Sequence, residues 1–237
     1  MISKGKYIGI SQRIPFDVLD SAIAVYLLEE EVEKDYILQR IQEYTKGANR
    51  AAKAASCVVQ ILSRQKWVLA HLKKISKVNP YTQLREDDRK ALCLCLICLT
   101  YPIIYDVLVA MSQGFKVQPQ INKKFISEKV MSIYGSNRSV DIAIDALLPM
   151  IIELNTIKRD KMSIYSLGSK LQVTNNFIAE MVIYADVKSS GSKSLLVEDL
   201  EFRPWFSFFE LPPNVAEVPS ILLTKKETAL NKGYLTI

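Results

Sequence analysis

Apolar residues recur every three or four positions along the first half of the chain, and this spacing predicts helices. One run starts after Pro15 and reaches Tyr44, where one or two helices are expected, because proline favours the first helical turn. Two more helices are predicted over about 46–65 and about 66–78, the second ending before the helix-breaking pair Asn79-Pro80.

The next apolar run predicts a helix from Asp87 to about residue 113, since acidic residues favour a helix N-terminus. Pro102 is expected to kink or split this helix, and Gly114 to close it. Residues 1–113 are therefore predicted to form an N-terminal helical bundle with a basic face.

A C-terminal domain over 114–237 is predicted to begin with a short extended stretch at 115–119. Asn122 is expected to cap a helix over 123–134, because its side chain can accept a hydrogen bond from a first-turn N–H. The inward face of that helix is predicted to hold Phe125, Val130 and Ile133.

A longer helix over about 139–154 follows a tight turn at 135–137. Residues 156–173 then predict a β-hairpin that turns at Leu167-Gly168-Ser169. Helix, short strand, helix, turn, helix and two-stranded wing succeed one another in the order of a winged helix-turn-helix. The predicted fold class is therefore mainly α, with a winged-helix-like unit that includes a small β-hairpin.

The last segment is expected to close the domain with helices over 177–187 and 217–231, the latter ended by Gly233. Between them lies an aromatic cluster. We interpret this cluster as core or subunit interface rather than as a surface that stacks on bases. Its members are Trp205, Phe206, Phe208 and Phe209.

Composition places the chain among globular proteins. Of its 237 residues 49% are apolar, which suits a packed core and argues against disorder. The start lacks a long apolar signal-peptide core, and the apolar run 91–105 is shorter than the roughly 20 residues of a membrane span. We expect a cytoplasmic protein without a membrane partner.

The cysteines and the single histidine offer little chemistry. Cys93, Cys95 and Cys98 lie in the apolar run, and helical geometry points the first two about 200° apart, so core roles without metal are expected. Four cysteines in all suit a reducing compartment. With only His71 and no phosphate-loop, dinucleotide or serine-hydrolase motif, we expect no enzyme and no cofactor.

Charge is distributed unevenly. Residues 1–45 carry a net charge of −3, residues 46–90 carry +8 and residues 91–237 carry +1. Between Tyr44 and Arg85 nine Lys or Arg residues occur without any Asp or Glu. A polyanionic partner is the simplest explanation, because self-repulsion disfavours a one-sign surface of this length.

The candidate nucleic-acid-binding residues fall into three groups. The first follows the predicted basic helices, the second the start of the predicted recognition helix, and the third the hairpin. On the helix over 46–65 the inward positions would be Ala52, Ala55, Val59 and Leu62. The candidates are Lys46, Arg50, Lys53, Arg64, Lys73 and Lys74; Asn137, Arg138 and Ser139; and Lys158, Arg159, Lys161 and Lys170.

Two observations keep other interpretations open. The acidic stretch from Glu29 to Asp35 could neutralise the basic helix within the fold, leaving an ordinary solvated surface. Asp141 and Asp145 lie on the predicted recognition helix, and Pro149 lies inside it, which is awkward for base reading. Winged helices also serve as protein-interaction modules.

The chain resembles the BrxA-like family, small proteins of bacterial BREX phage-defence systems. The resemblance rests on Tyr7 with Ser11, on the segments 41–64 and 94–107, and on the aromatic stretch around Trp205 with the ending Gly233-Tyr234-Leu235. It covers most of the chain but not residues 189–202. It implies an all-α, NusB-like N-terminal part, a winged-helix-like part and binding of double-stranded DNA without catalysis, and it transfers no individual site residue.

The leading hypothesis is a non-enzymatic component of a BREX-like phage-defence system that binds double-stranded DNA mainly through phosphates. Alternatives are an adaptor whose basic helix meets an acidic protein, and an RNA-binding NusB-like factor. The expected partners are double-stranded DNA and, through the resemblance, other defence-system proteins. The sequence leaves the oligomeric state open, a homo-oligomer included.

Overall fold

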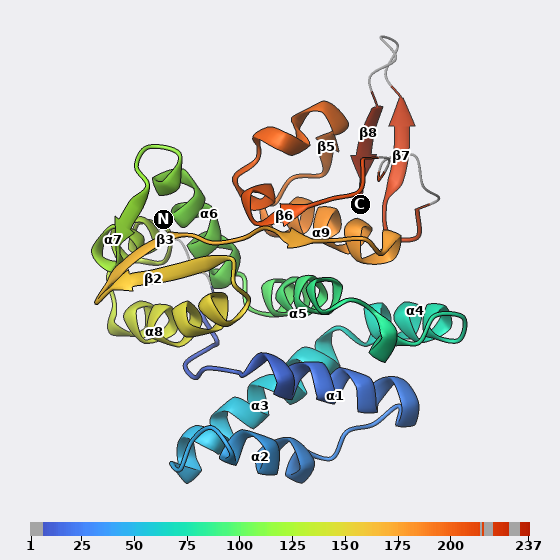
Figure 1. The fold of residues 1–237 in the computed structure, drawn as a ribbon, viewed down its shortest axis with the longest axis horizontal. Helices are drawn as coiled ribbons and strands as arrows, with labels where there is room; N and C mark the ends of the chain where they lie inside the picture. The colour runs from blue at the N-terminus through green and yellow to red at the C-terminus, as the bar shows by residue number, and fades with distance from the viewer. Residues whose placement is uncertain (1–6, 214, 216–219, 228–232) are drawn as a thin grey trace, which may run out of the picture.

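Helices make up most of the computed structural model, which describes residues 7–213, 215, 220–227 and 233–237. The first four helices and the central α5 form the lower part of the molecule in Figure 1. Two helices lie before Tyr44, where one or two were expected, and those expected over 46–65 and 66–78 are confirmed with slightly narrower bounds. The bounds are Phe16–Glu29 for α1, Lys34–Gln42 for α2, Ala48–Arg64 for α3 and Lys66–Ser76 for α4, followed by the short 3-10 helix η1, Tyr81–Gln83.

The helix α3 packs one face on its neighbours and turns the other outward. Ala55 and Leu62 are buried as predicted, whereas Ala52 and Val59 are only partly buried. The register differs because the helix begins at Ala48, after Gly47, and its contact with α2 and α5 selects a slightly rotated face. The buried positions are Ala51, Ala54, Ala55, Cys57, Val58, Ile61 and Leu62.

Pro102 splits the long apolar run, as predicted, into α5 (Glu86–Thr100) and α6 (Ile103–Phe115). Within the described residues no single helix combines the length and apolarity of a membrane span, and the one pair that reaches both together, α5 with α6, is bent by 115°. Residues 91–98 of α5 are all buried, because α1 and α3 pack on one side and α9 on the other. Burial raises the pKa of the Cys95 thiol, so the thiol is neutral at physiological pH.

The elements after α6 are a short strand, two helices and a hairpin. Asn122 caps α7 as predicted, its Oδ1 accepting a hydrogen bond of 2.8 Å from the Phe125 N–H. The strands form one antiparallel sheet in the order β1-β3-β2. The bounds are Gln120–Asn122 for β1, Lys123–Tyr134 for α7, Arg138–Glu153 for α8, Ile157–Lys161 for β2 and Ile164–Leu167 for β3.

Several local predictions in this region are wrong. The extended stretch lies at 120–122 rather than 115–119. Gly114 lies inside α6, where a Cβ would come within 2.7 Å of the side chains of Ile121 and Phe125, so it serves close packing rather than helix termination. On α7 Ile133 is 44% exposed, and Ile126 and Tyr134 occupy the buried face together with Val130.

The hairpin turns five residues earlier than predicted, at Met162-Ser163, where Ser163 has a φ of 60°. Gly168 is needed for another reason, since a Cβ there would lie 2.1 Å from the Asn155 carbonyl oxygen. The residues expected to form the second strand belong instead to β4 (Leu171–Gln172), which pairs in parallel with β6 (Phe209–Glu210).

The C-terminal segment packs on α9 (Asn176–Ser189), the helix predicted over 177–187. The aromatic cluster is buried as expected, and the Trp205 indole N–H donates to the Val182 carbonyl at 3.0 Å. The predicted helix over 217–231 is wrong: 216–219 and 228–232 lie outside the described residues, and residues 224–227 form a strand. The remaining bounds are Ser194–Leu196 for β5, Val197–Phe202 for η2, Pro204–Phe208 for η3, Thr224–Glu227 for β7 and Gly233–Thr236 for β8.

One carboxylate anchors this segment. The Oε1 atom of Glu180, on α9, accepts backbone hydrogen bonds from Ile221, Leu222 and Leu223 at 2.8, 2.6 and 3.0 Å. It also accepts a hydrogen bond from the hydroxyl of Ser220.

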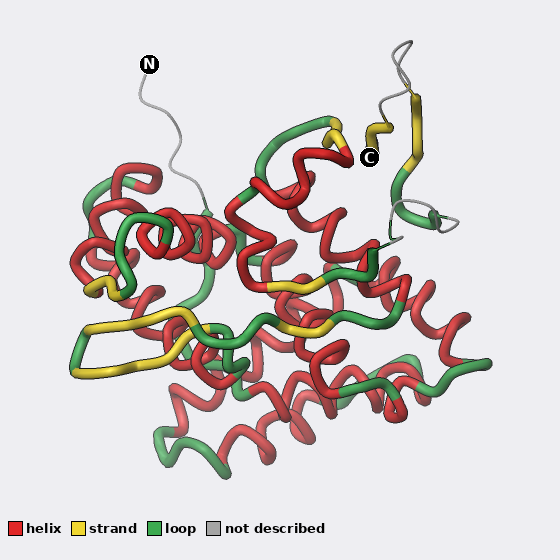
Figure 2. Tube along the Cα trace, turned by 45° about the horizontal axis from the view of Figure 1, so that its top comes forward, coloured by secondary structure: helices red, strands yellow, loops and turns green. Residues whose placement is uncertain are grey.

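Figure 2 shows the strands gathered at the hairpin, at the β4–β6 pair and near the C-terminus, around a helical body. One hydrophobic core extends from Ile10 to Leu235 and continues across residue 113, where the sequence predicts a domain boundary.

Candidate nucleic-acid interface

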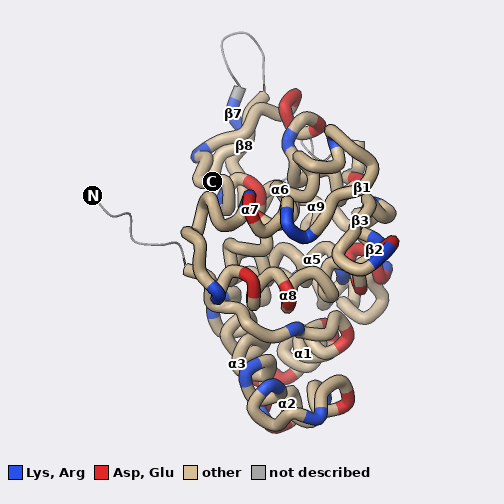
Figure 3. Tube along the Cα trace, turned by 90° about the vertical axis from the view of Figure 1, so that its left-hand side faces the viewer, with Lys and Arg blue, Asp and Glu red and all other residues tan. Residues whose placement is uncertain are grey.

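The outer face of α3 carries exposed cations. Lys46 lies just before the helix, and Arg50 and Lys53 lie on its first two turns. Figure 3 shows the Lys and Arg segments along α3 beside α2. Within the part of the chain that the structure describes, none of these three side chains forms an ion pair with a carboxylate. Their charges are therefore available to a polyanion.

Arg64, at the other end of α3, is partly engaged inside the molecule. Its guanidinium donates a long hydrogen bond of 3.4 Å to the Thr100 carbonyl at the end of α5. The same guanidinium lies 5.3 Å from the centre of the Tyr7 ring, a cation–π distance. Arg64 therefore joins the basic helix to the N-terminal segment.

Tyr7 connects this helix to the start of α8. Its ring lies 6.4 Å from that of Tyr101, with an angle of 25° between the ring planes. Residues 7–11 also line a cavity of about 440 Å³ together with Ser139 and Ile142. The structure thus brings Arg64 and the first turn of α8 to one surface, a relationship that charge and periodicity did not predict.

The start of α8 gives its three predicted residues different roles. The Asn137 Oδ1 accepts hydrogen bonds from the backbone N–H groups of Ser139 and Val140, at 2.8 and 3.2 Å, so this oxygen serves as the helix cap. Arg138 is exposed and has no carboxylate partner among the described residues, and Ser139 is one of the residues that line the cavity. Arg138 therefore supplies the positive charge at this end of the helix.

Beyond its first turn, α8 offers few groups for reading bases. The Asp145 carboxylate lies 2.6 Å from the Lys123 ammonium, and Asp141 accepts a hydrogen bond of 3.3 Å from the Ser127 hydroxyl, so both acids point toward α7. Glu153, at the far end, accepts from Arg13 at 2.8 Å and from the Phe16 N–H at 3.1 Å, and so binds α8 to the start of α1.

The hairpin presents its cations on an edge strand. Lys158, Arg159 and Lys161 are exposed on β2, which pairs only with β3 in the described sheet. Asp160 between them is held by hydrogen bonds from Gln120 and Ser166, at 2.7 and 2.9 Å. It therefore faces the sheet rather than a ligand.

Lys170 lies beyond the hairpin rather than on its second strand. It lines a cavity of about 200 Å³ together with Lys158, Asn155 and Ser169. Asp87 lines the same cavity, and its Oδ2 accepts the Gln172 N–H at 3.0 Å. The structure therefore brings Lys158 and Lys170 together at the base of the hairpin.

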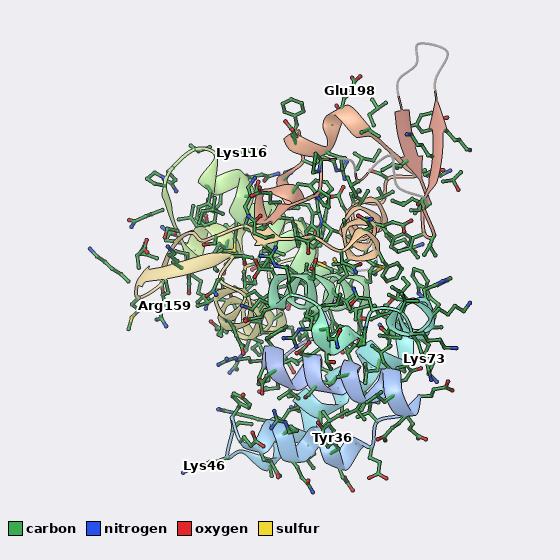
Figure 4. All side chains as sticks on the ribbon, turned by 45° about the vertical axis from the view of Figure 1, so that its right-hand side comes forward. Tyr36, Lys46, Lys73, Lys116, Arg159 and Glu198 are labelled. Carbon is green, nitrogen blue, oxygen red and sulfur yellow. The ribbon has the colours of Figure 1, made fainter. Side chains whose placement is uncertain are left out.

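The two candidates on α4 lie elsewhere. The Lys73 ammonium lies 2.5 Å from a carboxylate oxygen of Glu30, so one member of the acidic stretch does neutralise one predicted cation. Lys74 is exposed. Figure 4 shows Lys46 and Lys73 at opposite ends of the lower helices, so α4 does not extend the surface formed by the first turns of α3.

Known proteins offer no guide to this surface. Comparisons of the chain with protein-family models, with curated proteins and with solved structures found no match. Within the described residues no group of three or more His, Cys, Asp or Glu side chains is arranged to hold a metal ion.

Proposed function

We propose that residues 103–167, from α6 through β3, form a winged helix-turn-helix unit. The support is the element order α6-β1-α7-α8-β2-β3 together with the sheet order β1-β3-β2, in which the strand before the helix pair joins the hairpin. In helix-turn-helix proteins the N-terminal residues of the second helix contact the DNA. In this unit α8 contacts the DNA through Arg138, and the hairpin contacts the sugar–phosphate backbone beside it.

We propose on this basis that the chain is a non-enzymatic protein that binds double-stranded DNA mainly through phosphates. The observation that carries the proposal is the set of exposed cations without carboxylate partners, among the described residues, on and beside this unit: Arg138, Lys158, Arg159 and Lys161. Asp141 and Asp145 of α8 turn toward α7, and the outer face of α8 holds little else that is polar. Base reading is therefore limited to the first turn of α8. Binding should therefore depend weakly on sequence.

The basic face of α3 supplies a second set of phosphate contacts. It is connected to the first turn of α8 through Arg64 and Tyr7. A duplex that reaches both surfaces would be held at several phosphates, which favours affinity and a steep salt dependence.

The resemblance to the BrxA-like family extends this proposal to a role in phage defence. That extension rests on sequence pattern alone. Genes for a methyltransferase and a large ATPase beside the gene for this chain would support it, and an unrelated gene neighbourhood would count against it.

A fluorescence anisotropy titration with a random blunt duplex at low salt tests the DNA proposal. Binding is expected, with log affinity falling linearly against log salt by about 0.9 for each phosphate contacted. Single-stranded and duplex RNA serve as competitors. Tighter binding to RNA than to DNA would instead favour the NusB-like RNA-binding alternative, and absence of binding to either would favour an adaptor for an acidic protein.

A further inference from the structure

Tyr7 has no part in the phosphate contacts proposed above, yet the fold holds its ring in a defined place. Gly9 has a φ of 67°, a left-handed conformation that favours glycine. A Cβ at this position would lie 2.3 Å from two atoms of the Tyr7 ring. The segment therefore folds the ring back over Gly9, and a side chain at residue 9 would displace it.

The same ring is supported from the helical body. It stacks against Tyr101, which is fully buried and whose hydroxyl donates to the Gln60 Oε1 at 2.6 Å. The Arg64 guanidinium lies 5.3 Å from the ring centre. Despite these contacts Tyr7 remains 51% exposed. The result is a positioned aromatic ring, open to solvent, beside a cation.

The cavity next to this ring has the chemistry of a nucleobase site. Ile8, Ile10 and Ile142 are apolar lining residues, and Ser11 and Ser139 are polar ones. At about 440 Å³ the cavity has room for a base; Arg64 lies against the lining residue Tyr7, and Arg138 precedes the lining residue Ser139 in the chain. Aromatic rings with neighbouring arginines are how proteins hold unpaired bases whose phosphates are negatively charged.

We propose that this cavity binds an unpaired base of a DNA strand, stacked on the exposed part of the Tyr7 ring, with the adjoining phosphates on Arg64 and Arg138. A base inside a duplex is already stacked on its neighbours and cannot enter. The protein therefore prefers a duplex that carries a single-stranded extension or gap over a blunt duplex. This inference rests on the proposed DNA binding and adds the class of DNA end that is recognised.

The test compares three fluorescent duplexes of the same sequence with the full-length protein. One is blunt, one carries a short single-stranded extension, and one carries an extension of equal length made of abasic nucleotides, which keeps the phosphates and removes the bases. The extended duplex should bind about tenfold more tightly than the abasic one, the effect expected of base stacking on an aromatic side chain. Equal affinity for these two duplexes in the wild-type chain would overturn the inference without any variant being made.

Variants then assign the effect to the ring. Tyr7→Leu and Gly9→Ala should abolish the preference for the extended duplex, whereas Tyr7→Phe should keep it. Phe202→Leu, at another exposed aromatic residue, is the matched control and should change nothing. Affinity for the blunt duplex should stay the same in Phe202→Leu, and in the other three variants the preference is measured as the ratio of the affinities for the extended and the abasic duplex. A preference that survives in Tyr7→Leu would overturn the assignment.

The two proposals fail in distinguishable ways. Absence of binding to the blunt duplex, with binding to the extended duplex retained, would overturn double-stranded DNA binding and leave the base site standing. Binding to the blunt duplex with no gain from the extension would overturn the base site alone. An RNA extension that binds more tightly than the DNA extension would overturn the assignment to a DNA strand.

Discussion

The ammonium nitrogen of Lys73 lies 2.5 Å from a carboxylate oxygen of Glu30, so a cation that the charge pattern assigns to nucleic acid is paired within the chain. The hydrogen bond and charge of Lys73 hold the pKa of Glu30 below its ordinary value of 4.5. The contribution of this pair to stability is therefore present above pH 4.5 and is lost as the pH falls through the lowered pKa. Because the Glu30 side chain is exposed to solvent, the contribution of this ion pair to stability is expected to be small.

Lys73→Gln should raise the Glu30 pKa toward 4.5 and leave duplex affinity unchanged, because this cation is already paired. An NMR titration of the Glu30 carboxyl group and an anisotropy titration with a blunt duplex measure the two effects. Reduced duplex affinity in this variant would return Lys73 to the interface.

The triple variant Lys46→Gln/Arg50→Gln/Lys53→Gln should remain folded and bind the duplex less tightly, since it removes exposed charges and no packing. The slope of log affinity against log salt should become shallower by about 0.9 for each phosphate that the protein no longer neutralises. Lys73→Gln is the matched control, as it removes a cation from the adjoining helix. An unchanged slope would exclude α3 from the interface.

Lys158→Ala/Arg159→Ala should weaken binding to all duplex sequences alike, because the hairpin is proposed to contact only the backbone. Lys225→Ala/Lys226→Ala removes two lysines from another sheet edge, β7, and should have no effect. Titrations of both double variants across a salt series decide the point. If the Lys158→Ala/Arg159→Ala variant binds the duplex as tightly as the unchanged chain does, the hairpin is not a DNA contact.

Arg138→Ala distinguishes base reading from phosphate contact at the start of α8. If Arg138 reads a base, the variant should lose about 1–3 kcal/mol of binding free energy on the preferred site and little elsewhere. If it binds a phosphate, the loss should be uniform. A selection of bound sequences from a random pool, followed by titration of the best and an average sequence, separates the two outcomes.

Glu180→Gln should loosen the C-terminal segment, because the carboxylate accepts three backbone N–H groups and the Ser220 hydroxyl. A loss of about 1–3 kcal/mol is expected for hydrogen bonds to a buried charge. Urea unfolding gives the free energy, and hydrogen exchange of residues 220–227 shows whether the segment opens first. Glu210→Gln, at an exposed carboxylate that accepts the Gln172 side-chain amide, should be nearly neutral.

Local signals predicted much of the fold. Pro102 splits the apolar run because a proline ring cannot continue a helix, and Asn122 caps α7 because its side chain replaces a missing backbone acceptor. Such effects act within a few residues, so a single sequence reveals them. The helices of the N-terminal half were predictable for the same reason.

The hairpin and the C-terminus were predicted less well because distant pairing decides them. The turn at Met162-Ser163 lacks the glycine or asparagine that marks a tight turn. Gly168 does resemble a turn glycine, but glycine is required there because the backbone of Asn155 leaves no room for a side chain. Residues 224–227 contain good helix formers, yet they pair with β8. Tertiary contacts outweigh propensity in both places.

The candidate site shows the same division between local features, which the sequence predicted, and tertiary contacts, which it did not. The charge pattern identified cations that are exposed, but it could not tell that Glu30 pairs with Lys73 or that Asn137 uses its oxygen as a helix cap. In the sequence, Tyr7 contributes only to a family resemblance. A tyrosine two residues before a glycine gives no sign that its ring lies beside Arg64 or lines a cavity with Ser139, since that arrangement depends on how three separate segments meet.

The charged edge of β2 has a consequence for how the protein evolves. An unpaired strand edge invites the same edge of another molecule, and lysines discourage that contact. Lys158 and Lys161 are therefore expected to discourage edge-to-edge pairing of two chains, in addition to their proposed contact with DNA. A mutation that removes these two charges would also leave the edge open to such pairing, so their loss is expected to cost solubility even where DNA binding is not needed.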